Sequence, residues 1–238
     1  MQKINKIVKN VSTFLYPNIC LHCNDVGQDG LDLCRRCYSS LPWIMHACKH
    51  CAIPLPVSSA SICGACSKRD LYFDQAFAPF VFDQFIREAV YQYKFNSKLN
   101  YGKLLAHLLV QSIQNQNLTI PDVIVPVPLH RKRLRKRGFN QALEIARVLS
   151  KQIGGVISVQ DILRARETHA QMELAAKHRH ANVKDAFTLS APKPLFKSRH
   201  VVIIDDVMTT GNTVNEVAKR INMAGAERVD VWCVARVV

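Results

Sequence analysis

The chain has 238 residues, a formal net charge of +14 and a hydrophobic content of 48%. This length suits one domain of ordinary size with a small module, and the composition excludes global disorder. The positive charge indicates an anionic partner: nucleic acid, a phosphorylated small molecule or an acidic membrane face. No run approaches the roughly 20 apolar residues of a transmembrane helix, so we expect no membrane span.

The first residues predict a short amphipathic helix. Apolar side chains recur at helical spacing from Ile4 to Leu15, and Pro17 ends the pattern. Three lysines interrupt these residues and no small-residue cleavage site follows, which argues against a secretory signal. We therefore expect a helix over residues 1–19 that packs on the rest of a cytoplasmic protein, not a membrane anchor.

Eight of the nine cysteines form four C-x-x-C pairs, which define a cysteine-rich module over residues 20–70. Two such pairs complete a tetrahedral site of four thiolates, the set that zinc prefers, whereas a redox C-x-x-C normally occurs once. Sequential pairing gives one site from Cys20, Cys23, Cys34 and Cys37 and another from Cys48, Cys51, Cys63 and Cys66. Crossed pairing and occupancy of a single site are the alternatives. We expect one or two structural zinc ions that contribute to folding.

Beyond residue 70 the chain alternates apolar strands with amphipathic helices. We expect strands at 76–82, 123–127, 201–204 and 229–237, and helices at 85–95, 101–113, 141–153 and 213–223. This alternation predicts an α/β domain over residues 71–238, with a mainly parallel sheet covered by helices on both faces. Ligands of such sheets bind beyond the carboxyl ends of the strands.

The most informative segment is residues 201–213, VVIIDDVMTTGNT. Four branched apolar residues predict a strand that ends at Asp205 and Asp206, and a loop with small hydroxyl residues and Gly211 then leads into a helix. Backbone N–H groups and the positive end of the helix suit a phosphate there. Because carboxylates repel phosphate, we expect the two acids to face neutral hydroxyls or a metal ion. A ribose 5-phosphate satisfies both halves, and the spacing is neither that of a Walker A loop nor that of a dinucleotide loop.

Two further segments are basic. The first, residues 130–137, contains no acid and six cations: Arg131, Lys132, Arg133, Arg135, Lys136 and Arg137. Such a run is usually a solvated loop, but its place after an expected strand end suits pyrophosphate or a nucleic-acid backbone. The second begins with Arg164 and Arg166. A mobile lid that brings them onto a leaving pyrophosphate and an ordinary surface segment fit the sequence equally well.

The sequence Asp-Asp-x-x-Thr-Thr-Gly-x-Thr at 205–213 resembles the motif with which type I phosphoribosyltransferases bind 5-phosphoribosyl-1-pyrophosphate (PRPP). The resemblance implies that PRPP binds with Mg²⁺ and that two carboxylates and two arginines act in catalysis. The implied catalytic residues are Asp205, Asp206, Arg164 and Arg166. The implied PRPP-binding residues are Asp205, Asp206, Val207, Met208, Thr209, Thr210, Gly211, Asn212 and Thr213.

The four C-x-x-C pairs, the PRPP motif and the segments between them resemble the ComF family (ComFC and GntX-like proteins) over nearly the whole chain. The matching segments are Pro126-Val-Pro128, the RGFNQ sequence at 137–141, Arg164, Arg166, Thr168, Gln171, Arg179 and Asn182. The family implies a double zinc ribbon before a type I phosphoribosyltransferase fold. It also implies a cytoplasmic bacterial protein of natural transformation that handles incoming single-stranded DNA, with other DNA-uptake proteins as partners. Lys177-His178 departs mildly from the family, which commonly has an acidic residue there.

Two functions follow. The first is a phosphoribosyltransferase in which Mg²⁺ neutralises the leaving pyrophosphate and the carboxylates stabilise positive charge at the anomeric carbon. Its acceptor is not apparent, although residues 71–118 are a candidate binding region. The second is a non-catalytic DNA-binding accessory protein that uses the fold as a PRPP sensor or scaffold. Tyr38, Trp43 or Phe139 would then stack on unpaired bases, although core packing is the simpler interpretation of each.

Overall fold

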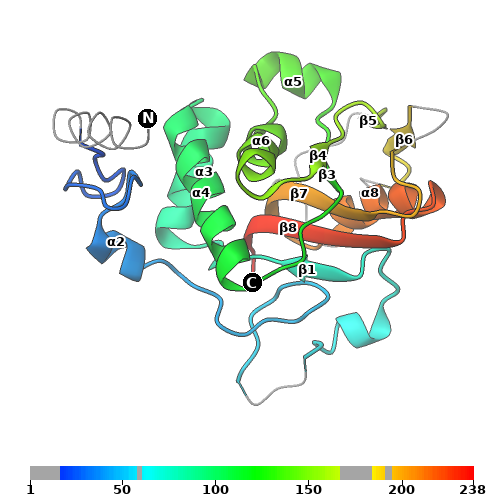
Figure 1. The fold of residues 1–238 in the computed structure, drawn as a ribbon, viewed down its shortest axis with the longest axis horizontal. Coiled ribbons are helices and arrows are strands. Elements are labelled where there is room, and N and C mark those ends of the chain that lie inside the picture. The colour runs from blue at the N-terminus through cyan, green and yellow to red at the C-terminus, as the bar shows by residue number, and fades with distance from the viewer. Residues whose placement is uncertain (1–16, 58–60, 167–183, 191–194) are drawn as a thin grey trace, which may run out of the picture. The chain divides into compact units, whose positions relative to one another are not determined.

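The computed structural model describes residues 17–57, 61–166, 184–190 and 195–238 (Figure 1). Contacts divide the chain into two compact units, Met1–Leu41 and Pro42–Val238. The smaller unit contains the first two C-x-x-C pairs and the helix α2 (Arg35–Ser39). The helix expected over residues 1–19 lies almost wholly outside the described residues, and the domain boundary expected near residue 70 stays a prediction.

The larger unit is an α/β domain that begins with the second two C-x-x-C pairs. Its helices are η1 (Cys66–Lys68), α3 (Gln84–Phe95), α4 (Leu99–Asn115), α5 (Arg131–Arg137), α6 (Gln141–Ile153) and α8 (Asn212–Met223). Its strands are β1 (Gln75–Phe77), β2 (Phe80–Val81), β3 (Val123–Pro126), β4 (Val156–Ile157), β5 (Ile162–Arg164), β6 (Phe187–Leu189), β7 (His200–Met208) and β8 (Arg228–Arg236). The expected helices at 85–95, 101–113, 141–153 and 213–223 are thereby confirmed within two residues at each end.

The main sheet is parallel, in the order β1-β8-β7-β3-β4, and β2 also pairs with β8. Inward-facing residues of β3, β7 and β8 join apolar residues of α8 in one buried core. On the other face α6 contacts β3 and β7 and α4 contacts β8, and Figure 1 shows α3, α4 and α6 together on that side. The expected mainly parallel sheet with helices on both faces is confirmed. The short antiparallel pair β5–β6 was not expected.

The prediction of one strand over residues 76–82 is wrong in one respect, because this segment forms two short strands. Gln75–Phe77 and Phe80–Val81 both pair with β8. Pro79 lies between them and has no N–H to donate, so it cannot continue the ladder.

The strand expected to end at the two carboxylates is longer than predicted. β7 continues to Met208, and its ladder with β8 runs from His200↔Arg228 to Met208↔Arg236. Apolarity ends at Ile204, but the backbone pairing is fixed by the neighbouring strand and not by side-chain polarity. Asp205 and Asp206 therefore lie on a strand, and the loop is shorter than expected.

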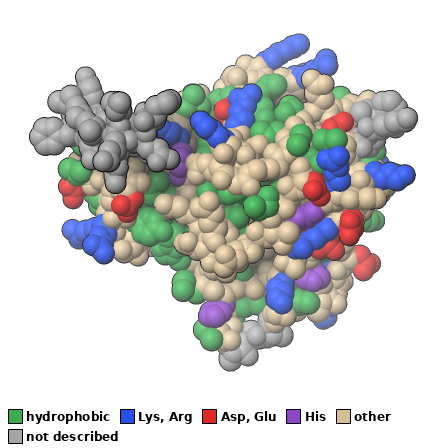
Figure 2. All heavy atoms as spheres, in the orientation of Figure 1, with side chains coloured by type: hydrophobic (Ala, Val, Ile, Leu, Met, Phe, Trp, Pro, Cys, Tyr) green, Lys and Arg blue, Asp and Glu red, His purple; other side chains and the backbone are tan. Residues whose placement is uncertain are grey.

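The basic run expected as a solvated loop is a helix. α5 has no buried residue, and Gly138 ends it in the left-handed conformation, with a φ of 84°. Arg, Lys and Leu are good helix formers, and glycine is the usual residue for such a C-terminal stop. In Figure 2, Lys and Arg side chains project from the edge where Figure 1 places α5.

No helix among the described residues is long and apolar enough to cross a membrane.

Candidate functional site

The cysteines form two clusters, and the sequential pairing expected from the sequence is confirmed. The first cysteine cluster is Cys20, Cys23, Cys34 and Cys37, and the second is Cys48, Cys51, Cys63 and Cys66. Within each cluster the four sulfur atoms lie within 4.8 Å of one another. None of these cysteines forms a disulfide in the structure.

The geometry of both clusters fits zinc. The Sγ atoms of Cys23 and Cys34 are 3.6 Å apart, and those of Cys51 and Cys63 are 3.7 Å apart. A zinc–sulfur distance of about 2.3 Å gives a tetrahedron with edges of about 3.8 Å. Backbone N–H groups point at the sulfur atoms, as from Cys63 to Cys48 Sγ at 3.2 Å, and such donors stabilise thiolates. Each cluster is therefore suited to one structural zinc ion.

The phosphate loop, residues 205–213, connects β7 to the amino end of α8. Gly211 is the N-cap of this helix with a φ of 79° and has no side chain with which to cap it, although the N–H of Asn212 donates to Thr210 Oγ1 at 3.5 Å. The positive φ favours glycine, and a Cβ atom at residue 211 would also lie 2.8 Å from Met208 Cε, so the end of that methionine side chain would have to move. A 12-residue helix with an open amino end presents N–H donors and a positive dipole to an anion.

A pocket opens where the carboxyl ends of β3 and β7 meet, because these two strands are adjacent and parallel. This is the edge at which ligands bind in open α/β sheets. Of the phosphate loop, Asp205, Asp206, Val207, Thr209 and Thr213 line the pocket. Met208 and Asn212 are instead buried, at 3% and 8% exposure, and support the loop from within.

The two carboxylates differ in their surroundings. Side chains alternate between the faces of a strand, so Asp205 continues the face of Val201 and Ile203 while Asp206 points to the other. On that face Lys94 of α3 lies 2.8 Å from Asp206 Oδ2, and both side chains are largely buried, at 15% and 6% exposure. We expected both acids to face hydroxyls or a metal ion. Asp206 is instead paired with a lysine, although the pair lies at the pocket wall.

Asp205 carries the more perturbed ionisation. Burial and then the neighbouring Asp206 carboxylate raise the pKa of Asp205 to about 7, and Lys94 opposes the shift. Near neutral pH a cation beside Asp205 would therefore displace its proton.

Three arginines line the pocket with the carboxylates. Arg133 and Arg137 lie four residues apart on one face of α5, and Arg164 ends β5. Burial, followed by repulsion from Arg133, lowers the pKa of Arg164 to about 10. Burial also lowers the pKa of Arg137, with Arg133 again adding to the shift. Since Arg137 and Arg164 are partly desolvated and Arg133 repels both, an anion between the three would relieve both costs.

The other expected basic residues lie elsewhere. Arg166 is outside the pocket lining, and its Nη2 donates to the carbonyl oxygen of Lys184 at 2.6 Å. The outer residues of α5 are exposed: Arg131, Lys132, Arg135 and Lys136. Thr168, Gln171, Arg179 and Asn182, with which the expected lid continues, lie outside the described residues.

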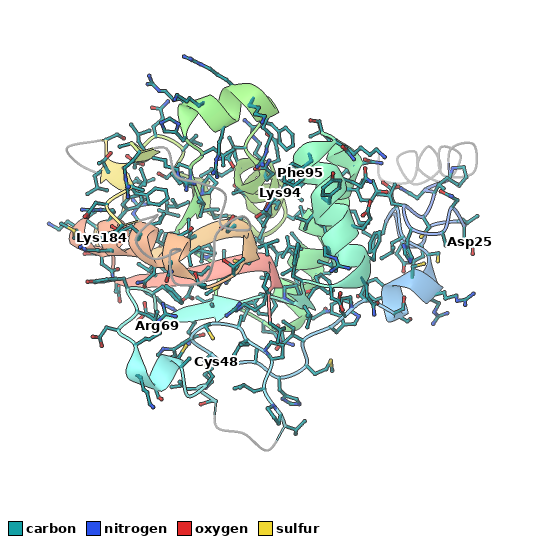
Figure 3. The ribbon with its side chains drawn as sticks, turned by 180° about the vertical axis from the view of Figure 1, so that it is seen from behind. Asp25, Cys48, Arg69, Lys94, Phe95 and Lys184 are labelled. Carbon is teal, nitrogen blue, oxygen red and sulfur yellow. The ribbon has the colours of Figure 1, made fainter. Side chains whose placement is uncertain are left out.

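Sequence reasoning gave no site role to several residues of the pocket wall. Lys94 and Phe95 come from the end of α3 (Figure 3), and Gln141 begins α6. Lys94 follows Ile86 and Val90 at four-residue intervals, so a lysine on the buried stripe of the helix was the available signal. Gln141 is 3% exposed, and its Nε2 has no hydrogen-bond partner among the described residues. Gln141 is the last residue of the RGFNQ segment that resembles the ComF family, but the resemblance gave it no role.

Two of the aromatics considered for base stacking pack in the fold instead. Trp43 lies against Phe80 with ring centroids 4.6 Å apart, and Phe139 lies against Tyr93 at 5.2 Å.

The parallel sheet, the Asp-Asp strand end and the glycine-capped phosphate loop define a protein of the type I phosphoribosyltransferase fold. A family model described as the phosphoribosyl transferase domain matches residues 95–237, and one described as the double zinc ribbon domain matches residues 11–67. The chain is 32% identical to competence protein F of Haemophilus influenzae over 91% of this chain and 96% of that protein. It is also 32% identical to the DNA utilization protein YhgH of Salmonella typhimurium over 92% and 97%.

The chain therefore belongs to the ComF family, in which a double zinc ribbon precedes a phosphoribosyl transferase domain. Among solved structures, adenine phosphoribosyltransferase of Thermoanaerobacter pseudethanolicus is 15% identical, with a TM-score of 0.37, over 59% of this chain and 83% of that one.

Proposed function

We propose that the protein binds PRPP with Mg²⁺ in the pocket at the carboxyl ends of β3 and β7. The observation that carries the proposal is the arrangement of charge across this pocket. Two carboxylates and a phosphate loop form one wall, and three arginines, of which Arg137 and Arg164 are partly desolvated, contribute to the lining. A ligand with a 5-phosphate, two free hydroxyls and a pyrophosphate matches this distribution of charge.

Each part of PRPP has a candidate partner. The 5-phosphate would accept from the N–H groups and hydroxyls of the phosphate loop, Asp205 would accept from a ribose hydroxyl, and Arg133, Arg137 and Arg164 would bind pyrophosphate. Carboxylate oxygens suit Mg²⁺. Because Lys94 already neutralises Asp206, we assign Asp205 as the protein carboxylate nearest to the metal. Bound Mg²⁺ would supply charge neutralisation of the pyrophosphate.

We infer that the reaction, where it occurs, is transfer of the phosphoribosyl group to an acceptor. The bond between the anomeric carbon and pyrophosphate breaks, a bond from the acceptor forms, and the acceptor loses a proton. Asp205 would stabilise the positive charge that develops on the sugar, and the arginines would stabilise the departing anion. Residues 71–118 stay the candidate acceptor region because α3 supplies Lys94 and Phe95 to the pocket.

We further propose that the protein acts in natural transformation, in the cytoplasm, on incoming single-stranded DNA. The names of two relatives, competence protein F and DNA utilization protein, support a role in competence and DNA use. A surface next to the pocket supports this partner. Tyr91 and Phe95 are 51% and 56% exposed, their ring centroids are 5.1 Å apart, and Arg137 lies 5.6 Å from the Phe95 ring. Exposed aromatic rings beside a basic helix combine base stacking with phosphate contacts, which is how proteins bind single strands.

The same surface leaves a second candidate function in place. A non-catalytic accessory protein would bind DNA on α5 and use PRPP as a signal, without group transfer. An enzyme and a PRPP sensor both require PRPP in the pocket and differ in turnover, whereas a scaffold would bind DNA without PRPP. Release of pyrophosphate from PRPP in the presence of single-stranded DNA favours the enzyme, and binding of both ligands without release favours the accessory protein.

Calorimetric titration with PRPP and Mg²⁺ tests the shared step. Replacing the two acids together, Asp205→Asn with Asp206→Asn, should abolish measurable binding, because the ribose and metal partners are lost. Asp83→Asn is the matched control, since Asn retains the N-cap of α3 that Asp83 provides. Wild-type protein that takes up no PRPP, or a double variant that binds it normally, would refute the proposal.

Salt dependence tests the DNA surface. Neutralising Arg131, Arg135 and Lys136 with glutamine should lower the slope of log affinity against log salt for single-stranded DNA by about 2, since each phosphate contact contributes about 0.7. The control replaces three exposed lysines elsewhere, Lys103, Lys151 and Lys197. Equal slopes for the two triple variants would count against α5 as the DNA-binding element.

A further inference from the structure

The carboxyl end of β8 carries a buried arginine that joins two parts of the larger unit. Arg236 is 7% exposed. Its Nε donates to the carbonyl oxygen of Cys51 at 2.7 Å, and its Nη1 donates to the carbonyl oxygen of Met208 at 3.2 Å and to those of Thr209 and Val237. One guanidinium therefore connects the second cysteine cluster to the start of the phosphate loop.

These bonds fix the direction of the loop peptides. In a trans peptide the carbonyl oxygen and the following N–H point to opposite sides, and the described residues contain no cis bond. With the carbonyls of Met208 and Thr209 held on Arg236, the N–H groups of Thr209 and Thr210 point away from the cation. Consecutive N–H groups directed away from the protein interior form the anion-binding arrangement that a phosphate requires.

A second connection reaches the other end of the loop. Arg69 follows η1, which holds Cys66, and its N–H donates to the carbonyl oxygen of Cys66 at 3.3 Å. The Nη2 of Arg69 donates to Asn212 Oδ1 at 3.1 Å, at the first residue of α8. Three residues later the N–H of Tyr72 donates to Asn215 Oδ1 at 2.7 Å. Figure 3 shows Cys48 and Arg69 on the same side of the sheet, in the segment that passes beneath it.

The segment that provides these contacts depends on its cysteines for its shape. Between residues 42 and 74, the described residues contain only the three-residue η1 as regular structure. A metal bound by four thiolates supplies the cross-link that such a segment needs to fold. Without it, the backbone of Cys51 and the segment from Cys66 to Arg69 lose their fixed positions, and the loop loses the partners that orient it.

We propose that the second cysteine cluster, when it holds zinc, positions the phosphate loop through Arg236 and Arg69, so that the loop is ordered by one zinc site and not by the other. Arg236 and Arg69 are positioning residues, because they act on the loop backbone and on Asn212. The consequence for PRPP affinity depends on the proposed function, but the order of the loop is a property of the protein without ligand.

Paired variants of the full chain test the metal. Cys63→Ser removes a ligand of the second cluster without touching the Cys51 carbonyl, and Cys23→Ser removes a ligand of the first cluster. Metal analysis should find one zinc ion fewer in each variant. Hydrogen exchange at residues 207–215 should become faster in Cys63→Ser only. PRPP affinity should fall at least about tenfold in Cys63→Ser, since a lost hydrogen bond to a charged group contributes about 1.5–3 kcal/mol, and less than about threefold in Cys23→Ser.

Variants of the connecting arginines keep the test valid if Cys63→Ser does not fold. Arg236→Lys retains the charge but cannot reach several carbonyls with one planar fork, and Arg228→Lys is its control on the same strand, where Arg228 pairs with Asp230 at 2.8 Å. Arg69→Met removes the bond to Asn212, and Lys68→Met is its exposed neighbour of equal charge. Arg236→Lys and Arg69→Met should each speed exchange in the loop and weaken PRPP binding, and their controls should do neither.

The outcomes separate this proposal from the one before it. Faster exchange in the loop with no PRPP binding by the wild type supports the connection and refutes the proposed function. Normal exchange in Arg236→Lys and Arg69→Met, or equal effects of Cys23→Ser and Cys63→Ser, would overturn the connection even if PRPP binds.

Discussion

Asp205 is the residue at which the pocket responds to pH. Its pKa is raised to about 7 by burial and by Asp206, so the folded protein favours the protonated form more than the unfolded chain does. A group of this kind stabilises the fold fully below its unfolded pKa, near 4, and loses that contribution as pH rises through about 7.

Replacement of Asp205 by asparagine should remove this pH dependence. The unfolding free energy of Asp205→Asn minus that of the wild type should increase by about 4 kcal/mol between pH 4 and pH 7 and then stay constant, because a shift of about three pKa units corresponds to about 1.4 kcal/mol per unit. Urea denaturation at several pH values measures the difference. A difference that is constant over this range would contradict the assigned ionisation.

Gln141 is a residue that we expect to favour PRPP binding at the expense of stability. A buried donor without a partner costs about 1–3 kcal/mol, and an apolar side chain of similar shape avoids that cost. We expect Gln141→Leu to be as stable as the wild type or more stable by about 1 kcal/mol, yet to bind PRPP at least about fivefold more weakly, because a ligand oxygen is the partner that Nε2 lacks. Thermal unfolding and calorimetry measure the two effects. Weaker stability with unchanged affinity would assign the glutamine to the fold alone.

Individual side chains of the pocket were only partly predictable. The pair of acids, the threonines and Gly211 lie within nine consecutive residues, so a local motif was enough to find them. Lys94 lies 112 positions before Asp206, and its partner depends on how α3 packs across the sheet. The same holds for Arg133 and Arg137, whose shared face appears only once the basic run is known to be helical.

At the scale of elements, periodicity predicted the long helices and the strand positions because burial of one face imposes it. It failed where backbone pairing decides the conformation. β7 extends through polar residues because β8 supplies hydrogen bonds as far as Arg236, and α5 forms although no side chain of it is buried. The composition of the β7 segment does not show which strand will pair with it. The α5 segment has no apolar periodicity, because none of its side chains is buried.

The glycine cap of α8 gives a prediction at this scale. Gly211 and Gly138 both have positive φ, of 79° and 84°, but a Cβ meets Met208 only at position 211. Gly211→Ala and Gly138→Ala should each lower stability by about 1–2 kcal/mol through backbone strain. Only Gly211→Ala should reduce PRPP affinity, by about tenfold or more, because only this strained position lies in the phosphate loop. Equal affinities in the two variants would mean that close approach at Gly211 is unimportant for binding.

The double zinc ribbon domain matches residues 11–67, but the contacts within the structure divide the chain into two compact units after Leu41. The division therefore falls inside the ribbon. The second cluster belongs with the sheet because Ala52 is 1% exposed in the core that β7 and α8 share. The N–H of Ala76 on β1 also donates to the carbonyl oxygen of Lys49 at 2.9 Å. The spacing of the cysteine pairs can be read from the sequence. The surface on which each half of the ribbon packs cannot.

The stability of two fragments, residues 42–238 and residues 71–238, tests where the phosphoribosyltransferase domain begins. We expect residues 42–238 to unfold cooperatively and to contain one zinc ion per chain, against two in the full chain. Residues 71–238, the domain predicted from composition, lack the Cys51 carbonyl that Arg236 binds and the core contact of Ala52. Their melting temperature should therefore be lower by at least about 5 °C, since one or two kcal/mol shift the melting of a domain of this size by several degrees. Circular dichroism and metal analysis provide both measurements, and equal melting of the two fragments would place the boundary near residue 70 after all.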